Sequence, residues 1–303
     1  GLLSFESVSA TLSALAEATL EESMSVARQS LGGKIDLDSV DLGIVAYGKL
    51  GSQELGYNSD LDIVFLYQSD ATHSPGNDTT PYHCGRVIQR LIHILTTRTA
   101  AGNLYQTDLQ LRPSGRAGTV VSSLSAFESY QMAHAWTWEH QALVRARVVA
   151  GCNRARQRFE AIRDEVLCRE RDQDALRVDV LAMRDKMVDH LASNQPGCFH
   201  LKQDPGGIVD IEFMVQYGVL RWASRHGELT RFTDNVRLLE TLAALELMPA
   251  QDAGLLREAY LAYRSAAHRA SLRKEKSIVG DGEFRELRDG VRTIWQHWFD
   301  LSK

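Results

Sequence analysis

The sequence has 303 residues, of which 44% are hydrophobic and 24% charged, and its formal net charge is −5. This composition is typical of a globular protein in solution, and the length is enough for two domains with separate cores. The slightly negative charge provides no basic surface for nonspecific binding, so we expect no nucleic-acid partner. The four cysteines form no C-x-x-C pair, which argues against a zinc ribbon or a disulfide framework.

No stretch of the chain approaches the roughly 18 consecutive apolar residues that a transmembrane helix needs, and the N-terminus lacks the pattern of a signal peptide. We therefore expect a cytoplasmic protein without a membrane partner. The chain starts at Gly1 rather than at methionine, which indicates that a natural segment is missing upstream.

The first half of the sequence alternates between helix and strand patterns. In chain order, we predict a helix over 4–30, strands over 41–47 and 61–67, a surface loop over 69–80, a helix over 82–97, and strands over 104–111 and 118–122. The first two strands are expected in one small mixed sheet. Residues 1–150 are therefore predicted to form an α+β domain.

After Ser123 we find no strand pattern and predict only helices. Their expected ranges are 124–132, 136–149, 154–167, 174–191, 209–223, 233–245, 250–273 and 283–301. Asp234 has the character of a helix N-cap. Residues 151–303 are therefore predicted to form an all-α helical bundle domain.

The pattern that best indicates chemistry is an acidic pair at the start of the second strand. Asp60 and Asp62 are two residues apart, so their side chains point the same way if the segment is extended. Aspartate is uncommon in strands, and paired carboxylates are suited to hold a divalent cation such as Mg²⁺, with phosphates and water completing its shell. Asp108 lies in the next plausible strand and is the candidate third ligand.

A glycine-rich turn precedes the acidic pair. Gly48 and Gly51 would let the backbone approach a phosphate closely, while Lys49 and Ser52 offer a cation and a hydroxyl donor. These four residues are the predicted nucleotide contacts. An isolated D-x-D is more often a solvated strand end, and the glycine turn with Asp108 is what favours a functional site here.

Two other enzyme classes also use D-x-D motifs, the aspartyl-phosphate hydrolases and many glycosyltransferases. Both place the acids after the apolar run of a strand, whereas here the apolar residues 63–67 follow the acids. A glycine turn, a spacer and acids at the start of a strand resemble the nucleotidyltransferase superfamily of DNA polymerase β.

A longer resemblance covers nearly the whole chain. Its segments are 48–62 (GKLGSQELGYNSDLD), 109–115 (LQLRPSG), 136–147 (WTWEHQALVRAR), 206–213 (GGIVDIEF) and 229–237 (LTRFTDNVR). Together they are similar to the glutamine synthetase adenylyltransferase family. That family carries an adenylyl-removing half and an adenylylating half in one polypeptide, and segments 136–147 and 229–237 resemble the C-terminal, adenylylating half.

The resemblance implies transfer of AMP from ATP to a tyrosine hydroxyl of glutamine synthetase, with release of pyrophosphate. It also implies that Asp60, Asp62 and Asp108 bind Mg²⁺ or Mn²⁺ in a two-metal mechanism. Glutamine as effector and the PII signalling protein as partner follow from the same resemblance. Two alternatives are the adenylyl-removing half, which would release AMP by phosphorolysis, and a non-catalytic module that only binds PII or glutamine synthetase.

Other residues have weaker claims to function. We place Glu139, Arg145 and Arg147 on one helix and Asp210 with Glu212 on another, and structural ion pairs are favoured over catalytic roles, although Arg147 has the geometry to bind a phosphate. The tryptophans Trp136, Trp138 and Trp222 are expected in the core rather than as a platform for adenine.

Overall fold

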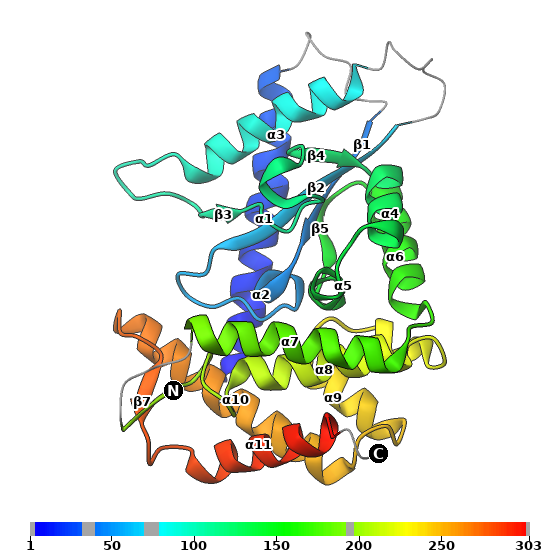
Figure 1. Cartoon of the computed structure of the whole chain (residues 1–303). Coiled ribbons are helices and arrows are strands. Elements are labelled where there is room, and N and C mark those ends of the chain that lie inside the picture. The colour runs from blue at the N-terminus through cyan, green and yellow to red at the C-terminus, as the bar shows by residue number, and fades with distance from the viewer. Residues whose placement is uncertain (1–3, 32–39, 70–78, 192–196, 301–303) are drawn as a thin grey trace. The chain divides into compact units, whose positions relative to one another are not determined.

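The computed structural model describes residues 4–31, 40–69, 79–191 and 197–300 (Figure 1). Most of the predicted surface loop over 69–80 lies outside these ranges. By its internal contacts the chain divides into two compact units, Ser9–Val166 and Gly1–Val8 with Leu167–Lys303. Each unit is considered by itself below.

The unit Ser9–Val166 is built on a five-stranded mixed sheet. The central strand β1 (Val40–Ala46) runs antiparallel to β2 (Leu61–Ser69) on one side and to β5 (Arg147–Gly151) on the other. The short strands β3 (Thr107–Asp108) and β4 (Val121–Ser123) both run parallel to β2. The predicted α+β class and mixed sheet are thus confirmed for this unit.

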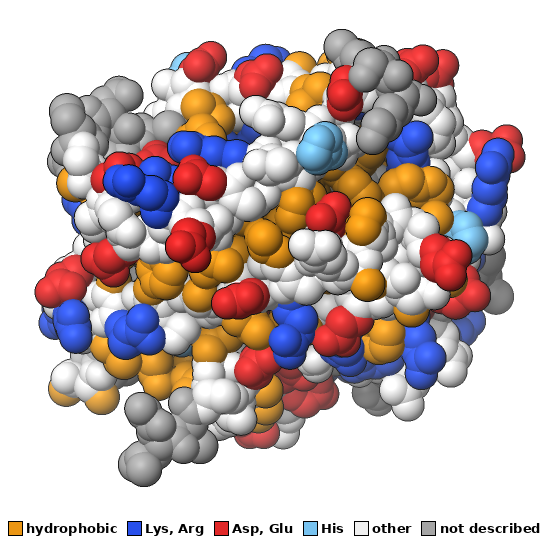
Figure 2. Space-filling model, turned by 90° about the horizontal axis from the view of Figure 1, so that it is seen from below, with side chains coloured by type: hydrophobic (Ala, Val, Ile, Leu, Met, Phe, Trp, Pro, Cys, Tyr) orange, Lys and Arg blue, Asp and Glu red, His pale blue; other side chains and the backbone are white. Residues whose placement is uncertain are grey.

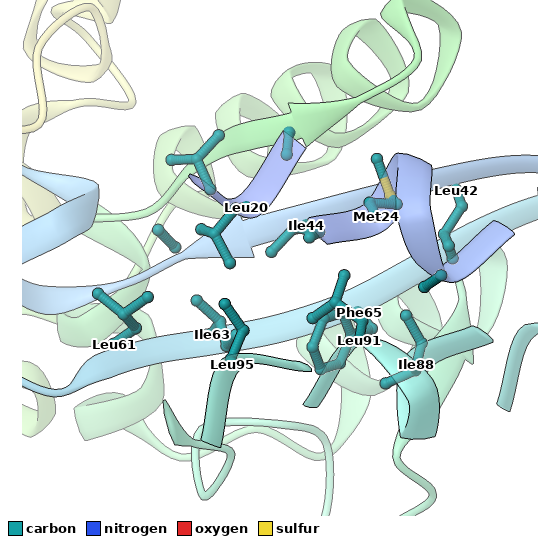
Figure 3. Close-up of a cluster of buried hydrophobic side chains, with 14 of the residues drawn as sticks. Leu20, Met24, Leu42, Ile44, Leu61, Ile63, Phe65, Ile88, Leu91 and Leu95 are labelled. Carbon is teal, nitrogen blue, oxygen red and sulfur yellow. The ribbon is translucent and has the colours of Figure 1, made fainter. Parts of the chain in front are cut away.

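Two helices supply most of the apolar core on this sheet, α1 (Phe5–Leu31) and α3 (Thr80–Thr96). In α1 the buried residues Ala16, Leu20 and Ala27 recur at helical spacing. Alternate residues of β2, Ile63 and Phe65, belong to the same core cluster, because successive strand side chains point to opposite faces. Figure 3 shows Leu20, Ile63 and Phe65 with Leu91 and Leu95 of α3 as one cluster.

Helices α4 (Leu124–Ala133), α5 (Thr137–Val144) and α6 (Asn153–Cys168) complete this unit. The aromatic rings of Phe127 in α4 and Phe159 in α6 lie 5.9 Å apart between centroids. Arg163 of α6 donates to the carbonyl oxygens of Leu143 and Val144 at the end of α5. Most of α6 therefore belongs with the first unit, beyond the boundary at residue 150 that the sequence predicts.

One strand prediction and one helix prediction in this unit need correction. The strand predicted over 104–111 contains only the two residues of β3, because the chain turns directly after Asp108. The helix predicted over 136–149 is wrong in its second half, since α5 ends at Val144 and β5 begins at Arg147. Strands therefore do continue after Ser123. A short apolar run such as 148–150 fits helix and strand equally well by periodicity, and its pairing with β1 decides the outcome.

The second unit contains five long helices among its described residues. They are α7 (Gln173–Leu191), α8 (Ile208–Trp222), α9 (Asn235–Ala244), α10 (Ala250–Leu272) and α11 (Arg285–Trp298). The prediction of Asp234 as N-cap is confirmed, because its carboxylate accepts from the Arg237 N–H at 2.9 Å.

The predicted all-α character of this unit is wrong in one respect. Strand β6 (Cys198–His200) pairs antiparallel with β7 (Ile278–Gly280), so the helices carry a two-stranded ribbon.

Charged side chains of both signs are interspersed with apolar ones on the face drawn in Figure 2. Within the described part of the chain, none of the helices combines the length and apolar character needed to span a bilayer.

Candidate active site

The glycine turn and the start of β2 lie next to each other through the backbone. After β1 ends at Ala46, the residues Gly48–Gly51 form a single helical turn, α2. The Tyr47 N–H donates to the carbonyl oxygen of Asp62 at 2.8 Å, which ties the two segments together. The turn is thus fixed beside the first residues of β2.

Gly48 keeps space open at the Asp62 carboxylate. Its φ of +54° lies in the left-handed region that side chains disfavour. A Cβ at this position would stand 2.7 Å from Oδ2 of Asp62. No other residue type can therefore occupy this position without displacing the carboxylate or straining the turn.

Asp62 and Asp108 are register partners on neighbouring parallel strands. The pairing sets Leu61 against Thr107 and Asp62 against Asp108, and the Leu61 N–H donates to the Gln106 carbonyl at 2.9 Å. Neighbouring strands lie about 4.8 Å apart, and paired residues point to the same face of the sheet. Both side chains are half-buried. The backbone therefore holds these two carboxylates side by side.

Asp108 is further oriented by its own turn. Its Oδ1 accepts from the backbone N–H of Gln110 at 2.8 Å, a local bond that short acidic side chains commonly make at turns. Arg112 then fixes the loop that follows: its guanidinium donates to the carbonyl oxygens of Leu109, Arg116 and Gly118 at 2.7, 3.2 and 3.2 Å.

The third predicted acid, Asp60, lies outside this strand pairing. Asp60 is exposed and precedes the first residue of β2. Among the described residues, no group of three or more His, Cys, Asp or Glu side chains is placed to hold a metal ion. The structure thus pairs Asp62 and Asp108 in register, while Asp60 stands just before the strand. Two adjacent carboxylates beside the space left by Gly48 fit a hard divalent cation, which would take its remaining oxygen ligands from a nucleotide and water.

The four predicted nucleotide contacts divide into two pairs. Lys49 is half-buried and its Nζ donates to the Ser59 hydroxyl at 3.3 Å, directly before Asp60. Gly48 thus borders the Asp62 carboxylate, and Lys49 contacts the residue next to Asp60. Ser52, in contrast, is fully buried, and its hydroxyl lies within hydrogen-bond distance of the Gly48 carbonyl and the Glu54 carboxylate.

Gly51 is also used for packing. A Cβ on Gly51 would lie 1.9 Å from the carbonyl oxygen of Arg145, so only glycine fits against the segment that joins α5 to β5. The burial of Gly51 and Ser52 goes against the predicted role of both residues in holding a phosphate. Their residue types are explained by close packing behind the turn instead.

Comparison with known proteins gives the family. The model of the family described as glutamate-ammonia ligase adenylyltransferase matches residues 1–162, which include the glycine turn and all three aspartates. The chain belongs to the glutamate-ammonia ligase adenylyltransferase family. A second model, that of the GlnD PII-uridylyltransferase, matches residues 181–278.

Curated relatives of this adenylyltransferase-family chain carry the name bifunctional glutamine synthetase adenylyltransferase/adenylyl-removing enzyme. The protein from Pseudomonas aeruginosa is 48% identical over 98% of this chain and 32% of its own length. The one from Methylococcus capsulatus is 50% identical over 86% of this chain and 28% of its own length. The one from Thioalkalivibrio sulfidiphilus is 44% identical over 100% of this chain and 33% of its own length. The chain thus spans about a third of the length of these relatives.

In this adenylyltransferase-family chain, two arginines hold the glycine turn from behind. The buried Arg145 Nη2 lies 2.7 Å from both the Ser52 hydroxyl and Oε2 of Glu54. Arg147 donates to the carbonyl oxygens of Gly51 and Leu50 and pairs with the carboxylate of Glu17. Removing one partner of such a buried ion pair typically costs about 3–5 kcal/mol of stability.

Sequence reasoning missed this support because it placed Arg145 and Arg147 on one helix with Glu139. Arg145 instead follows the last residue of α5, and Arg147 begins β5. Arg147 is held by backbone and Glu17, so its contacts support the structural role rather than the alternative at a phosphate. One signal in the sequence could have indicated this support. The two arginines are two residues apart, and in an extended segment their side chains would point to the same side.

Glu139 is likewise a structural residue of this adenylyltransferase-family chain. Its carboxylate accepts from the Trp136 N–H at 2.9 Å and from the Tyr130 hydroxyl at 3.0 Å, which caps α5. Burial, and then the Glu139 charge, raise the pKa of the Tyr47 hydroxyl well above its usual range. The core assignment of the tryptophans is wrong for Trp136 and Trp138, which are 70% and 38% exposed, because they stand at the N-cap and in the first turn of α5.

Asp210 and Glu212 belong to the helical unit. Asp210 pairs with the buried Arg184 at 2.5 Å and accepts from the Gly206 N–H at 2.6 Å. Burial is the main influence on this carboxyl and raises its pKa in spite of Arg184. Glu212 accepts from the Tyr260 hydroxyl at 3.5 Å. These contacts tie α8 to its neighbours within that unit. The favoured ion pair is confirmed for Asp210, and the hydrogen bond of Glu212 supports a structural role.

Proposed function

We propose that this chain transfers AMP from ATP to a tyrosine hydroxyl of glutamine synthetase and releases pyrophosphate. The proposal rests on one observation above all: Asp62 and Asp108 are paired in register beside a glycine, Gly48, whose missing side chain leaves the carboxylate accessible. The names of the relatives support the same substrate and reaction.

The proposed fold of the unit Ser9–Val166 is that of the polymerase β-like nucleotidyltransferases. What supports this is the order of features along the chain: a strand, a glycine turn, and then a strand with Asp60 just before it and Asp62 within it. That strand pairs in parallel with the strand that carries Asp108. The relatives' names include both adenylylation and adenylyl removal. We assign the adenylylating reaction because segments 136–147 and 229–237 resemble that half of the family.

In the proposed site, Asp60, Asp62 and Asp108 hold Mg²⁺ or Mn²⁺, which supplies charge neutralisation at the triphosphate and eases ionisation of the tyrosine. Asp60 is exposed and free of the sheet ladder, so its side chain has room to turn toward the pair when a nucleotide is present. Lys49 lies near enough to meet a phosphate oxygen, and the Gly48 backbone borders the same space.

Proton transfer in this proposal falls to Asp108. A tyrosine hydroxyl has a pKa near 10, so it needs less help to ionise than an aliphatic alcohol. Oδ1 of Asp108 accepts from the Gln110 backbone N–H at 2.8 Å, whereas Oδ2 accepts only the longer bond of 3.5 Å from the Gln110 side-chain amide. Oδ2 is therefore the less firmly held oxygen and the better placed to take the proton. The half-buried position keeps this oxygen reachable by a protein substrate.

The wider context of the reaction is also part of the proposal. Glutamine synthetase is the protein substrate, the PII signalling protein and glutamine are the regulators, and the reaction takes place in the cytoplasm. The match of residues 181–278 to a PII-uridylyltransferase model supports a connection to PII.

The test is incorporation of label from ATP labelled in the α-phosphate into unmodified glutamine synthetase, with Mg²⁺ present. We expect Asp62→Asn to reduce incorporation at least 100-fold while circular dichroism stays unchanged, because the lost charge matters for the reaction and not for the fold. The matched control is Asp189→Asn, an exposed acid of α7, which should retain full activity. Near-normal incorporation by Asp62→Asn would contradict the proposed site.

The same assay separates the alternatives. Absence of incorporation together with phosphate-dependent release of AMP from modified glutamine synthetase would identify the adenylyl-removing half. Absence of both reactions, with binding to glutamine synthetase or PII retained, would identify a non-catalytic module.

A further inference from the structure

A cavity in the helical unit gathers positive charge away from the acidic pair. Its volume is about 320 Å³, and its charged lining consists of Arg171, Arg221, Arg225 and Glu170. Three guanidinium groups and one carboxylate give this lining a charge of +2 in a chain whose net charge is −5. All lining residues belong to the unit that contains Leu167–Lys303.

Arg221 is held rigidly in this cavity. Its guanidinium carbon lies 5.1 Å from the centre of the Trp222 ring and 5.6 Å from that of Tyr217, both within the range of cation–π attraction. Its Nη1 also donates to the Tyr217 hydroxyl. A guanidinium fixed in this way loses little side-chain freedom when an anion binds.

Arg171 brings a second, half-buried charge. Its Nη1 donates to the carbonyl oxygens of Leu167 and Arg169, at 3.0 Å each. Burial, and then the neighbouring Arg169, lower the pKa of this guanidinium to about 10, so it is still fully charged at neutral pH. The energetic penalty of a buried cation falls when an anion enters the cavity.

A structural explanation accounts for part of this cluster. Helix α6 ends at Cys168, shortly before Arg171, and helix α8 ends at Trp222, next to Arg221. Cations are favourable at the C-terminal ends of helices. This explains the bonds of Arg171 to backbone carbonyls. Arg225 also follows the end of α8, but its exposed side chain forms no hydrogen bond or ion pair with the described residues, so it holds no helix carbonyl in place.

We propose that this cavity binds the phosphate group of a small anionic ligand. Guanidinium groups match phosphate oxygens with paired N–H donors, and three of them suit a doubly charged phosphate better than a singly charged carboxylate. The Ser224 hydroxyl and the Trp222 ring, which also line the cavity, supply a further polar contact and a flat apolar wall. The volume is that of a pocket for a small molecule.

The test is calorimetric titration of the 303-residue chain with inorganic phosphate and, separately, with acetate. We expect phosphate to bind more tightly than acetate, and Arg225→Gln to weaken phosphate binding about tenfold or more, the effect of losing one charge-assisted hydrogen bond. Arg225→Glu should abolish binding. Arg273→Gln removes an exposed arginine that does not line the cavity and should leave the affinity unchanged.

Equal phosphate affinity of the natural chain and Arg225→Gln would overturn the proposal. So would a lower unfolding midpoint of Arg225→Gln in phosphate-free buffer with unchanged affinity, which is the result expected if the arginine only stabilises a helix end. The Asp62→Asn variant separates this site from the proposed catalytic one, because it should retain phosphate binding here. Loss of binding in Asp62→Asn alone would place the phosphate at the acidic pair and contradict the inference.

Discussion

Gly48 is the single residue whose replacement most directly tests the geometry of the acidic pair. We expect Gly48→Ala to lower the free energy of unfolding by about 1–2 kcal/mol, because a Cβ is strained at positive φ. AMP transfer should fall at least tenfold in addition, since the new methyl group would meet Oδ2 of Asp62 at 2.7 Å. Urea unfolding and the label-incorporation assay measure the two effects separately.

Gly197→Ala is the matched control for backbone strain. Its φ is +77°, and no heavy atom lies within 4 Å of the position of the added Cβ. This variant should lose stability to a similar extent and keep its transfer activity. If both variants lost activity equally, strain alone and not the contact with Asp62 would be responsible.

At the residue scale, the candidate acids and the glycines of the turn could be identified from the sequence, but the structural role of each glycine could not. Gly48 and Gly51 look alike in a G-K-L-G turn, yet one borders Asp62 and the other packs against the Arg145 carbonyl. The partner that buries Ser52 lies 93 residues further along the chain. The local sequence pattern carries no information about such a distant contact. A turn that binds phosphate and a turn that packs against another segment therefore have the same sequence pattern.

At the element scale, strand β2 and helices α1 and α3 are predictable because their apolar periodicity is strong and bounded by turn residues. Strand β5 is not predictable in this way, because no glycine or proline separates it from α5 and its conformation depends on its pairing with β1. The register that pairs Asp62 with Asp108 could not be predicted from the sequence either, since it depends on the two-residue strand β3.

The ribbon β6–β7 is connected to α11 by a charge cluster whose strength should depend on pH. Asp281 follows β7 and accepts from Arg288 at 2.7 Å and from Arg285 at 3.3 Å. The bond from Arg288 is the main cause that lowers the pKa of the Asp281 carboxyl below its ordinary value of 3.8. Because the folded-state pKa is the lower one, the stabilisation is present above pH 3.8 and is lost as the pH falls through the folded-state pKa.

Asp281→Asn should therefore lower the urea midpoint at pH 7 and have a smaller effect at pH 3. Asp289→Asn is the control, because its distance of 3.8 Å to Arg292 makes only a weak ion pair. A loss of stability in Asp281→Asn that is equal at both pH values would show that the charge of Asp281 is not what connects the ribbon to the helix.

At the scale of the whole molecule, the first unit should fold without the second. The core cluster on the sheet runs from Ala16 to Ala150, and α6 supplies Phe159 and Arg163 to the same unit. We expect a fragment of residues 4–168 to unfold cooperatively in urea. A fragment that ends at residue 150, the boundary that the sequence predicts, lacks α6 and should aggregate or unfold without a cooperative transition.

Circular dichroism of both fragments across a urea gradient decides between the two boundaries. Equal cooperativity of the fragments would favour the boundary at residue 150. The division after Val166 follows from contacts that link α6 to α4 and α5, and none of these is visible as a break in composition.

The in-register pairing of Asp62 with Asp108 has a consequence for evolution as well as for chemistry. Main-chain pairing places two like charges on strands about 4.8 Å apart, and their repulsion at half-exposed positions is on the order of 1 kcal/mol. In a chelator such as EDTA, Asp62→Asn should then resist urea better than the natural chain, and a lower midpoint would refute this. Natural selection for catalytic activity would then have retained an arrangement of charges that lowers the stability of the fold.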